Sequence, residues 1–201
     1  MSAVDDAVAA LTAGLPVILP FDTVYGLVAL AEREDAVRAM YELKRRVPTQ
    51  PTALVAATFE QLLDAVPELR ADEAVPRLLP GPYTLIVRNP ARRFRSLTGE
   101  NPAAIGVRIP HLPAETSEVV ERSGVVVATS ANDPGARDPA TLQDVPDRIR
   151  AGAGAEVDGG RIPGTPSTVV DLTTAEPRIL REGAVAGGEV LRRLGAAVRS
   201  S

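Results

Sequence analysis

Short apolar runs rich in Val, Ile, Leu and Ala alternate along this chain with longer segments of helical character. Because these runs span only five to seven residues or so, they indicate buried strands rather than helices. Strands are predicted at 16–20, 52–57, 83–88, 104–110, 125–129, 167–172 and 178–183. Helices are predicted at 3–13, 33–46, 58–66, 114–124 and 188–195. Helices between some strands and adjacent strands elsewhere are typical of a mixed α/β (α+β) fold, and we expect one domain over residues 1–201.

The composition excludes several classes of function. No apolar run approaches the roughly 18 residues of a membrane span, and the acidic N-terminus lacks the basic start of a signal peptide. The chain has no cysteine, which rules out a thiolate nucleophile and fits a cytoplasmic location. A formal net charge of −4 argues against a surface built for generic nucleic-acid binding.

Familiar catalytic machinery is missing from the sequence. There is no dinucleotide-binding G-x-G-x-x-G, no phosphate-binding P-loop and no G-x-S-x-G nucleophile elbow. The single histidine, His111, cannot form a metal cluster by itself. It lies between Pro110 and Leu112 in a predicted loop. We expect no metal site built from protein side chains. Two Gly-rich segments, 95–104 and 151–166, are predicted loops that could cover a site.

Small hydroxyl and amide residues recur where predicted strands begin or end. The stretches "PFDTVY", "PGPYTL", "VVVATSAN" and "PSTVV" carry Thr23, Tyr25, Thr84, Ser130, Asn132 and Ser167. Such residues at strand ends usually cap or turn the backbone. They are also the polar groups that line ligand sites at the ends of strands in α/β sheets. The residues alone leave both interpretations open.

Four basic residues favour the second interpretation. Lys44 is the only lysine among 22 basic residues and lies with Arg46 at the end of a predicted helix. Arg108 interrupts an apolar strand and Arg181 ends another. Arginine matches the geometry of carboxylates and phosphates, although an arginine in mid-strand can simply face solvent. Hydroxyls and cations without a nucleophile suggest that a polyanion is held for transfer by positioning and charge neutralisation.

Seven segments, in order, resemble the YrdC-like family of threonylcarbamoyl-adenylate synthases. They are "PFDTVYGL", "KRR", "PGPYTLIV", "GVRIP", "TSANDPG", "STVVD" and "ILREG", which extend from about Leu15 to Gly183. The resemblance implies a twisted mixed β-sheet with flanking helices around a deep basic cleft. It also implies a nucleotidyltransferase that joins L-threonine, bicarbonate and ATP into threonylcarbamoyl-adenylate and pyrophosphate for the t6A modification of tRNA. Partner proteins would complete that modification, and direct RNA binding would be weak or absent.

The resemblance also implies roles for individual residues. Lys44 and Arg46 would be catalytic and bind the phosphates, while Thr84, Asn132 and Arg181 would hold the rest of ATP. The threonine site would comprise Thr23, Tyr25, Arg108, Ser130 and Ser167, with Arg108 on the substrate carboxylate. Mg²⁺ is expected to accompany ATP.

The chain departs from the family pattern at several positions. Phe21 replaces a threonine, Val47 a proline and Pro134 a serine, and Gln50 and Thr52 replace the usual residues of a following segment. Because a pocket that loses a hydroxyl loses discrimination for a hydroxylated substrate, Phe21 leaves the identity of the amino acid open. The alternatives are a related carbamoyl-adenylating enzyme with another acceptor, and a non-catalytic RNA-binding module. Scarce aromatic residues disfavour the module.

Overall fold

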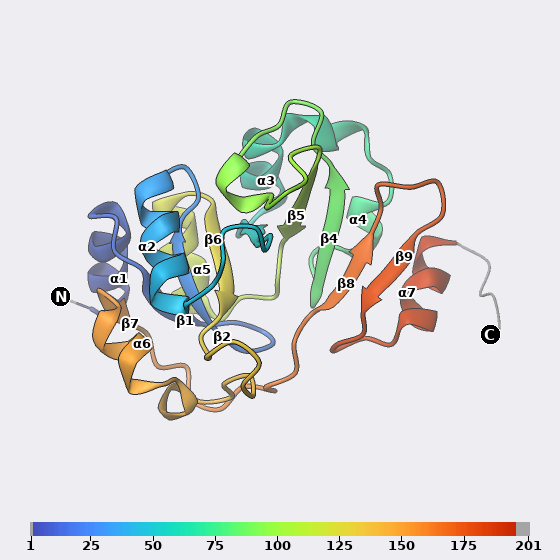
Figure 1. Cartoon of the computed structure of the whole chain (residues 1–201). Coiled ribbons are helices and arrows are strands. Elements are labelled where there is room, and N and C mark those ends of the chain that lie inside the picture. Colours follow the sequence, from blue (N-terminus) through green and yellow to red (C-terminus); the bar gives the residue numbers. More distant parts are fainter. Residues whose placement is uncertain (1, 196–201) are drawn as a thin grey trace.

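The computed structural model describes residues 2–195, so residue 1 and residues 196–201 of the predicted domain lie outside it. The described strands form one mixed sheet in the order β7-β1-β2-β6-β3-β5-β4-β8-β9 (Figure 1). The strands are β1 (Val17–Pro20), β2 (Tyr25–Leu30), β3 (Ala53–Val55), β4 (Tyr83–Arg88), β5 (Ala104–Arg108), β6 (Val126–Ser130), β7 (Ala155–Glu156), β8 (Thr168–Asp171) and β9 (Arg178–Arg181). Strand pairs β1/β7, β3/β5 and β4/β8 are parallel and the other pairs are antiparallel. The expected mixed sheet with flanking helices is confirmed.

Helices surround this sheet in the described part of the chain. They are α1 (Ala3–Thr12), α2 (Glu34–Lys44), α3 (Phe59–Ala65), α4 (Val75–Leu78), α5 (Ala114–Ser123), α6 (Asp147–Gly152) and α7 (Gly187–Leu194), with 3-10 turns η1 (Pro67–Ala71), η2 (Arg95–Leu97) and η3 (Leu142–Asp144). The five predicted helices are all present. Helix α1 begins with a reciprocal capping box, in which Asp5 N donates to Ser2 Oγ and Ser2 N donates to Asp5 Oδ2. No helix of residues 2–195 combines the length and apolar character needed to cross a membrane.

Strand β2, helix α6 and strand β7 are among the elements that the sequence does not predict. Strand β2 follows β1 through a four-residue connection, 21–24, and pairs with it antiparallel from Pro20↔Tyr25 onward. This connection has no Asn-Gly or Asp-Gly signal, so its residues do not predict a hairpin. Helix α6 and strand β7 lie in or beside the segment 151–166, which was predicted to be loop.

Alternate residues of the central strands face two separate cores. Val17 and Val28 belong to a cluster with α1 and α5, while Ile18 and Leu27 belong to a larger cluster with α2 and α6. Strands β1 and β2 are therefore buried on both faces, which explains why their sequences are continuous apolar runs instead of alternating ones.

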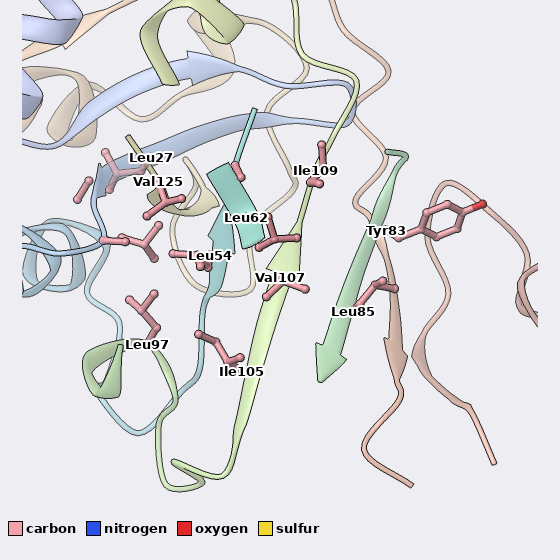
Figure 2. Close-up of a cluster of buried hydrophobic side chains, with 14 of the residues drawn as sticks. Leu27, Leu54, Leu62, Tyr83, Leu85, Leu97, Ile105, Val107, Ile109 and Val125 are labelled. Carbon is pink, nitrogen blue, oxygen red and sulfur yellow. The ribbon is translucent and has the colours of Figure 1, made fainter. Parts of the chain in front are cut away.

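The two faces differ in side-chain size at the centre of the sheet. On one face Val127, Leu54, Val107 and Leu85 pair in register across four strands and fill the larger core. Figure 2 shows Leu54, Val107 and Leu85 in this core. Their chain neighbours Ala128, Ala53, Gly106 and Ile86 pair in register on the opposite face. Three of these four residues are small, so an open space remains above this part of the sheet.

Candidate active site

A cavity of about 320 Å³ occupies the space above the small residues. Its floor is made by Ala128, Ala53, Gly106 and Ile86, and its walls come from the 21–24 connection, the start of β4, and the segments before and within β8 and β9. Small residues in mid-strand are typical of places where a ligand approaches the backbone closely. Cavities of this size lie at the lower end of the range found for small-molecule sites.

Seven of the ten predicted site residues line this cavity. They are Thr23, Arg46, Thr84, Arg108, Ser130, Ser167 and Arg181. These residues come from seven separate motifs of the sequence, and the fold brings them to one place. The proposed site residues therefore converge, with the exceptions of Lys44, Asn132 and Tyr25.

Arg108 is the most buried of the three cavity arginines. Its Nη2 lies 3.4 Å from both Asp22 Oδ1 and Thr23 Oγ1, and its Nε has no hydrogen-bond partner. Burial lowers the pKa of Arg108, while the charge of Asp22 opposes that effect. The guanidinium nevertheless stays charged, because arginine does not lose its proton in proteins. A buried cation with unused donors beside a cavity is suited to an incoming carboxylate.

Phe21 packs beside Arg108 in the cavity wall. The Cζ of Arg108 lies 5.7 Å from the centroid of the Phe21 ring, within the range of a cation–π contact. A Cβ built on Gly26 would lie only 2.6 Å from Cε2 of that ring, so the glycine makes room for it. The aromatic ring therefore replaces a hydroxyl directly next to the candidate carboxylate site.

Arg181 and two hydroxyls form a second polar group on the β4 and β8 side. Thr84 Oγ1 lies 2.8 Å from Ser167 Oγ, and Arg181 Nη2 donates to the Ser167 carbonyl at 2.9 Å and contacts its hydroxyl at 3.3 Å. Arg181 itself is exposed at the rim. A Cβ on Gly183 would lie 2.2 Å from the Pro166 oxygen, so a glycine is required where β9 leaves the site.

Arg46 stands at the opposite side, just beyond α2. Arg45 ends the helix in the left-handed region, with φ of 56°, and turns the chain toward the cavity. Arg46 Nη2 then donates to the Pro51 carbonyl at 2.6 Å. That bond fixes the cation beside Thr52, which also lines the cavity and bonds to the hydroxyl of Tyr41 at 2.8 Å.

Lys44 lies behind the cavity wall and not among its lining residues. Its side chain is buried, and Nζ donates to the Ser130 carbonyl at 2.7 Å and to both the carbonyl and side-chain oxygens of Asn132. Burial and the nearby charge of Arg46 lower the pKa of Lys44 to about 8. Asn132 is buried as well and accepts a bond from Ser130 Oγ at 2.7 Å. Lys44 and Asn132 thus support the turn that presents Ser130.

Tyr25 does not line the cavity, contrary to the role inferred from the resemblance. Its ring is fully buried, and its hydroxyl donates to the Gly160 carbonyl at 2.7 Å and to Asp158 Oδ1 at 3.1 Å. It also accepts from Gly159 N at 3.0 Å. Alternation along β2 explains the difference, because the neighbour of Tyr25, Gly26, is the residue that faces the cavity.

Asp138 and Leu180 stand out among the lining residues that the sequence does not predict. Asp138 is the one carboxylate among the cavity's described lining, and Leu180 is a large exposed apolar residue at its rim. Asp138 lies in a loop that contains Gly and Pro and shows no hydrophobic periodicity. Leu180 has the character of an ordinary strand residue, so neither position carries a signal for a binding site. Among residues 2–195, no three His, Cys, Asp or Glu side chains gather as a metal-binding group.

A family model described as "Telomere recombination", that of the Sua5, YciO and YrdC proteins, matches residues 9–183. Threonylcarbamoyl-AMP synthase of Pyrococcus abyssi is 34% identical over 189 residues, which are 90% of this chain and 54% of that protein. A putative threonylcarbamoyl-AMP synthase of Mycobacterium tuberculosis is 31% identical over 193 residues, 94% of this chain and 88% of that protein. The chain thus spans about half of the first relative and most of the second.

Solved structures agree with these matches. The crystal structure of Pyrococcus abyssi Sua5 complexed with L-threonine superposes with a TM-score of 0.84 and 32% identity, covering 97% of this chain and 58% of that one. Escherichia coli YciO, at 22% identity and a TM-score of 0.79, shares the fold over 95% of this chain and 92% of its own. The matched segment contains every residue placed in the cavity above, and this chain belongs to the Sua5/YciO/YrdC family.

Proposed function

We propose that this chain is a nucleotidyltransferase that makes L-threonylcarbamoyl-adenylate and pyrophosphate from L-threonine, bicarbonate and ATP. The observation that carries the proposal is the convergence, in one cavity, of three arginines and four hydroxyl residues that the sequence predicts as site residues. The names of the relatives, and the Sua5 structure with L-threonine, support the same substrates. The product would serve tRNA t6A modification with partner proteins. The absence of cysteine is consistent with a cytoplasmic location.

The reaction requires two bond-forming steps. The threonine amine bonds to the carbon of bicarbonate and water leaves, which gives a carbamate. A carbamate oxygen then bonds to the α-phosphorus of ATP, and the bond from that phosphorus to pyrophosphate breaks. Neither step needs a protein nucleophile, so the protein contributes proximity and charge neutralisation.

The geometry suggests how the substrates divide the cavity. Arg108, with its unpaired Nε, would take the threonine carboxylate on the Thr23 side. Arg46 would take the phosphates near Ser130, and Arg181 with Thr84 and Ser167 would hold the nucleotide on the β8 side. Lys44 would act on the phosphates through the electrostatic field at the Ser130 turn, or directly if that turn opens.

Mg²⁺ would enter with ATP. Because Asp138 is the one carboxylate in the described lining, the protein offers at most one acidic ligand, and phosphate oxygens and water would supply the rest. In this arrangement the metal would neutralise phosphate charge.

The test is release of pyrophosphate by the purified chain. We expect release that requires ATP, bicarbonate and L-threonine together, and loss of release when any one is omitted. Pyrophosphate released at the same rate without any amino acid would contradict the proposal.

Phe21 favours one alternative within the same chemistry, an acceptor other than threonine. Its ring lies beside Arg108, where a hydroxyl in its place could bond to a hydroxylated substrate. Running the assay across the common amino acids with wild type and Phe21→Thr separates the two possibilities. Threonine as the best substrate of wild type supports the main proposal, and preference for an apolar amino acid that Phe21→Thr reverses supports the alternative.

A further inference from the structure

Helix α6 lies directly against the C-terminal end of α2, the helix that carries Lys44. A Cβ on Gly152 would lie 2.5 Å from Cδ1 of Leu43, so the glycine permits this close approach. Leu43 is the residue before Lys44. A helix outside all the recognised motifs therefore packs on the segment that positions the buried lysine.

Arg148 of α6 joins two segments that lie far apart in the sequence. Its Nη1 donates to the Leu43 carbonyl, and its Nη2 donates to Asp133 Oδ1 at 2.6 Å. Asp133 directly follows Asn132, whose oxygens accept from Lys44. Arg148 therefore connects, from outside, the same end of α2 and the same turn that Lys44 connects from inside.

These contacts also shape the electrostatics around Lys44. Four charged groups act on its ammonium: Arg46 and Arg148 lower the pKa of Lys44, and Asp133 and Asp138 raise it. Removing Arg148 would take away one repelling cation and leave Asp133 uncompensated. Both changes favour the protonated lysine.

We propose that Arg148 is a positioning residue that, through Asp133 and the Leu43 carbonyl, fixes the Lys44 ammonium and the Ser130 turn against the cavity. Its importance for turnover rests on the proposed function, whereas its effect on Lys44 does not. The chain offers a matched control in Arg150, on the same helix. The side chains of Arg148 and Arg150 are 32% and 34% exposed, but Arg150 pairs with Glu156 and touches neither segment.

The first experiment follows Lys44 itself. Because Lys44 is the only lysine, protein labelled with ¹³C at lysine Cε gives one lysine signal, whose shift reports its pKa. We expect the pKa of Lys44 to rise above its value of about 8 in Arg148→Met, although burial still holds it below 10.5, and to stay unchanged in Arg150→Met. An unchanged pKa in Arg148→Met, or equal rises in both variants, would overturn the proposal. Loss of global stability alone does not move the pKa of the folded state.

The second experiment measures turnover by pyrophosphate release. A displaced catalytic group costs on the order of 10- to 100-fold in rate, so we expect kcat of Arg148→Met to fall by that factor with KM for ATP little changed. Arg148→Lys, which can still reach one of the two oxygens, should recover part of the loss. Equal kcat in Arg148→Met and Arg150→Met would overturn the role in turnover. If wild type releases no pyrophosphate at all, the proposed function fails while the lysine titration still decides the positioning role.

Discussion

Lys44 and Asn132 meet in the interior, where the lysine ammonium donates to both the backbone and the side-chain oxygen of the asparagine. A third bond reaches the Ser130 carbonyl at 2.7 Å. All three ammonium protons are therefore used within the protein, and the lysine fixes the turn that carries Ser130 into the cavity. Its contribution to stability and its contribution to chemistry are linked.

Replacement of this lysine tests that link. Lys44→Met removes the lysine donor from three oxygens, of which Asn132 Oδ1 still accepts from Ser130 Oγ. The loss costs about 1–3 kcal/mol, and the variant also lacks the cation that the proposed reaction uses. We expect pyrophosphate release to be lost and the free energy of urea unfolding to fall by that amount. Arg38→Met, an exposed change on the same helix, is the control and should be nearly neutral. A Lys44→Met protein as stable as wild type would show that these bonds contribute nothing.

The pH dependence of stability gives an independent test. The folded-state pKa of Lys44, about 8, lies below its ordinary 10.5, so between these values the unfolded chain binds a proton that the folded chain has released. Stability contributed by Lys44 therefore rises as pH increases through this window. We expect the difference in unfolding free energy between wild type and Lys44→Met to grow from about pH 7 to about pH 9.5. The other titratable groups are common to both proteins, so their contributions cancel. A difference that shrinks with pH would contradict the lowered pKa.

Local patterns predicted most of the elements but not the hairpin that begins the sheet. The strand at 125–129 and the capped helix at 3–13 carry their own signals in composition and in Ser2 and Asp5. Strand β2 is also a short apolar run, "YGLVAL", but the 21–24 connection before it carries no hairpin turn signal. Its pairing with β6 is a long-range property.

The site residues also divide into those with a local sequence signal and those whose placement depends on the fold. Arg108 and Ser130 could be singled out because a cation or hydroxyl in an apolar strand stands out locally. The orientation of Tyr25 could not, since it depends on the register of β2, which places Gly26 toward the cavity. The Arg148 contacts depend on the docking of α6, a helix with no sequence signal strong enough to predict it.

The Tyr25→Phe variant tests whether the Tyr25 hydroxyl anchors the 158–160 segment or binds the substrate. The hydroxyl bonds to Asp158, Gly159 and Gly160 while remaining outside the cavity. We expect the variant to lose about 1–3 kcal/mol of stability, because buried partners are left unpaired. The KM for the amino acid should change by no more than about twofold. A residue that does not touch the substrate alters its binding free energy only indirectly, by about 0.4 kcal/mol. A large rise in that KM with unchanged stability would restore Tyr25 to the binding site.

Arg108 should govern affinity for the amino acid. Arg108→Gln removes the charge beside Asp22 and Thr23 while keeping some of the length. A charge-assisted bond is worth roughly 1.5–3 kcal/mol, so we expect the KM for the amino acid to rise by about 10- to 100-fold with the KM for ATP much less affected. Asp22→Asn changes the other member of the Arg108–Asp22 ion pair. It serves as a comparison because it leaves the cation in place. Equal increases in both KM values would place Arg108 in the nucleotide site instead.

Gly183 links the end of β9 to the Ser167 and Arg181 group. A Cβ at this position would lie 2.2 Å from the Pro166 oxygen and 2.5 Å from the Ser167 carbonyl carbon, both of them backbone atoms that cannot move aside cheaply. Gly183→Ala should therefore push Ser167 away from Thr84, destabilise the fold by about 1–3 kcal/mol and raise the KM for ATP.

Gly188→Ala is the matched control for that substitution. Its Cβ would meet only Arg192 Nη1, at 3.8 Å, in the first turn of α7. Alanine there should raise stability by up to about 1 kcal/mol and leave both KM values unchanged. Urea unfolding and pyrophosphate release on the two variants check the pair of expectations. If Gly183→Ala retained full stability and the wild-type KM for ATP, the close approach of β9 to Ser167 would not be what holds this side of the cavity together.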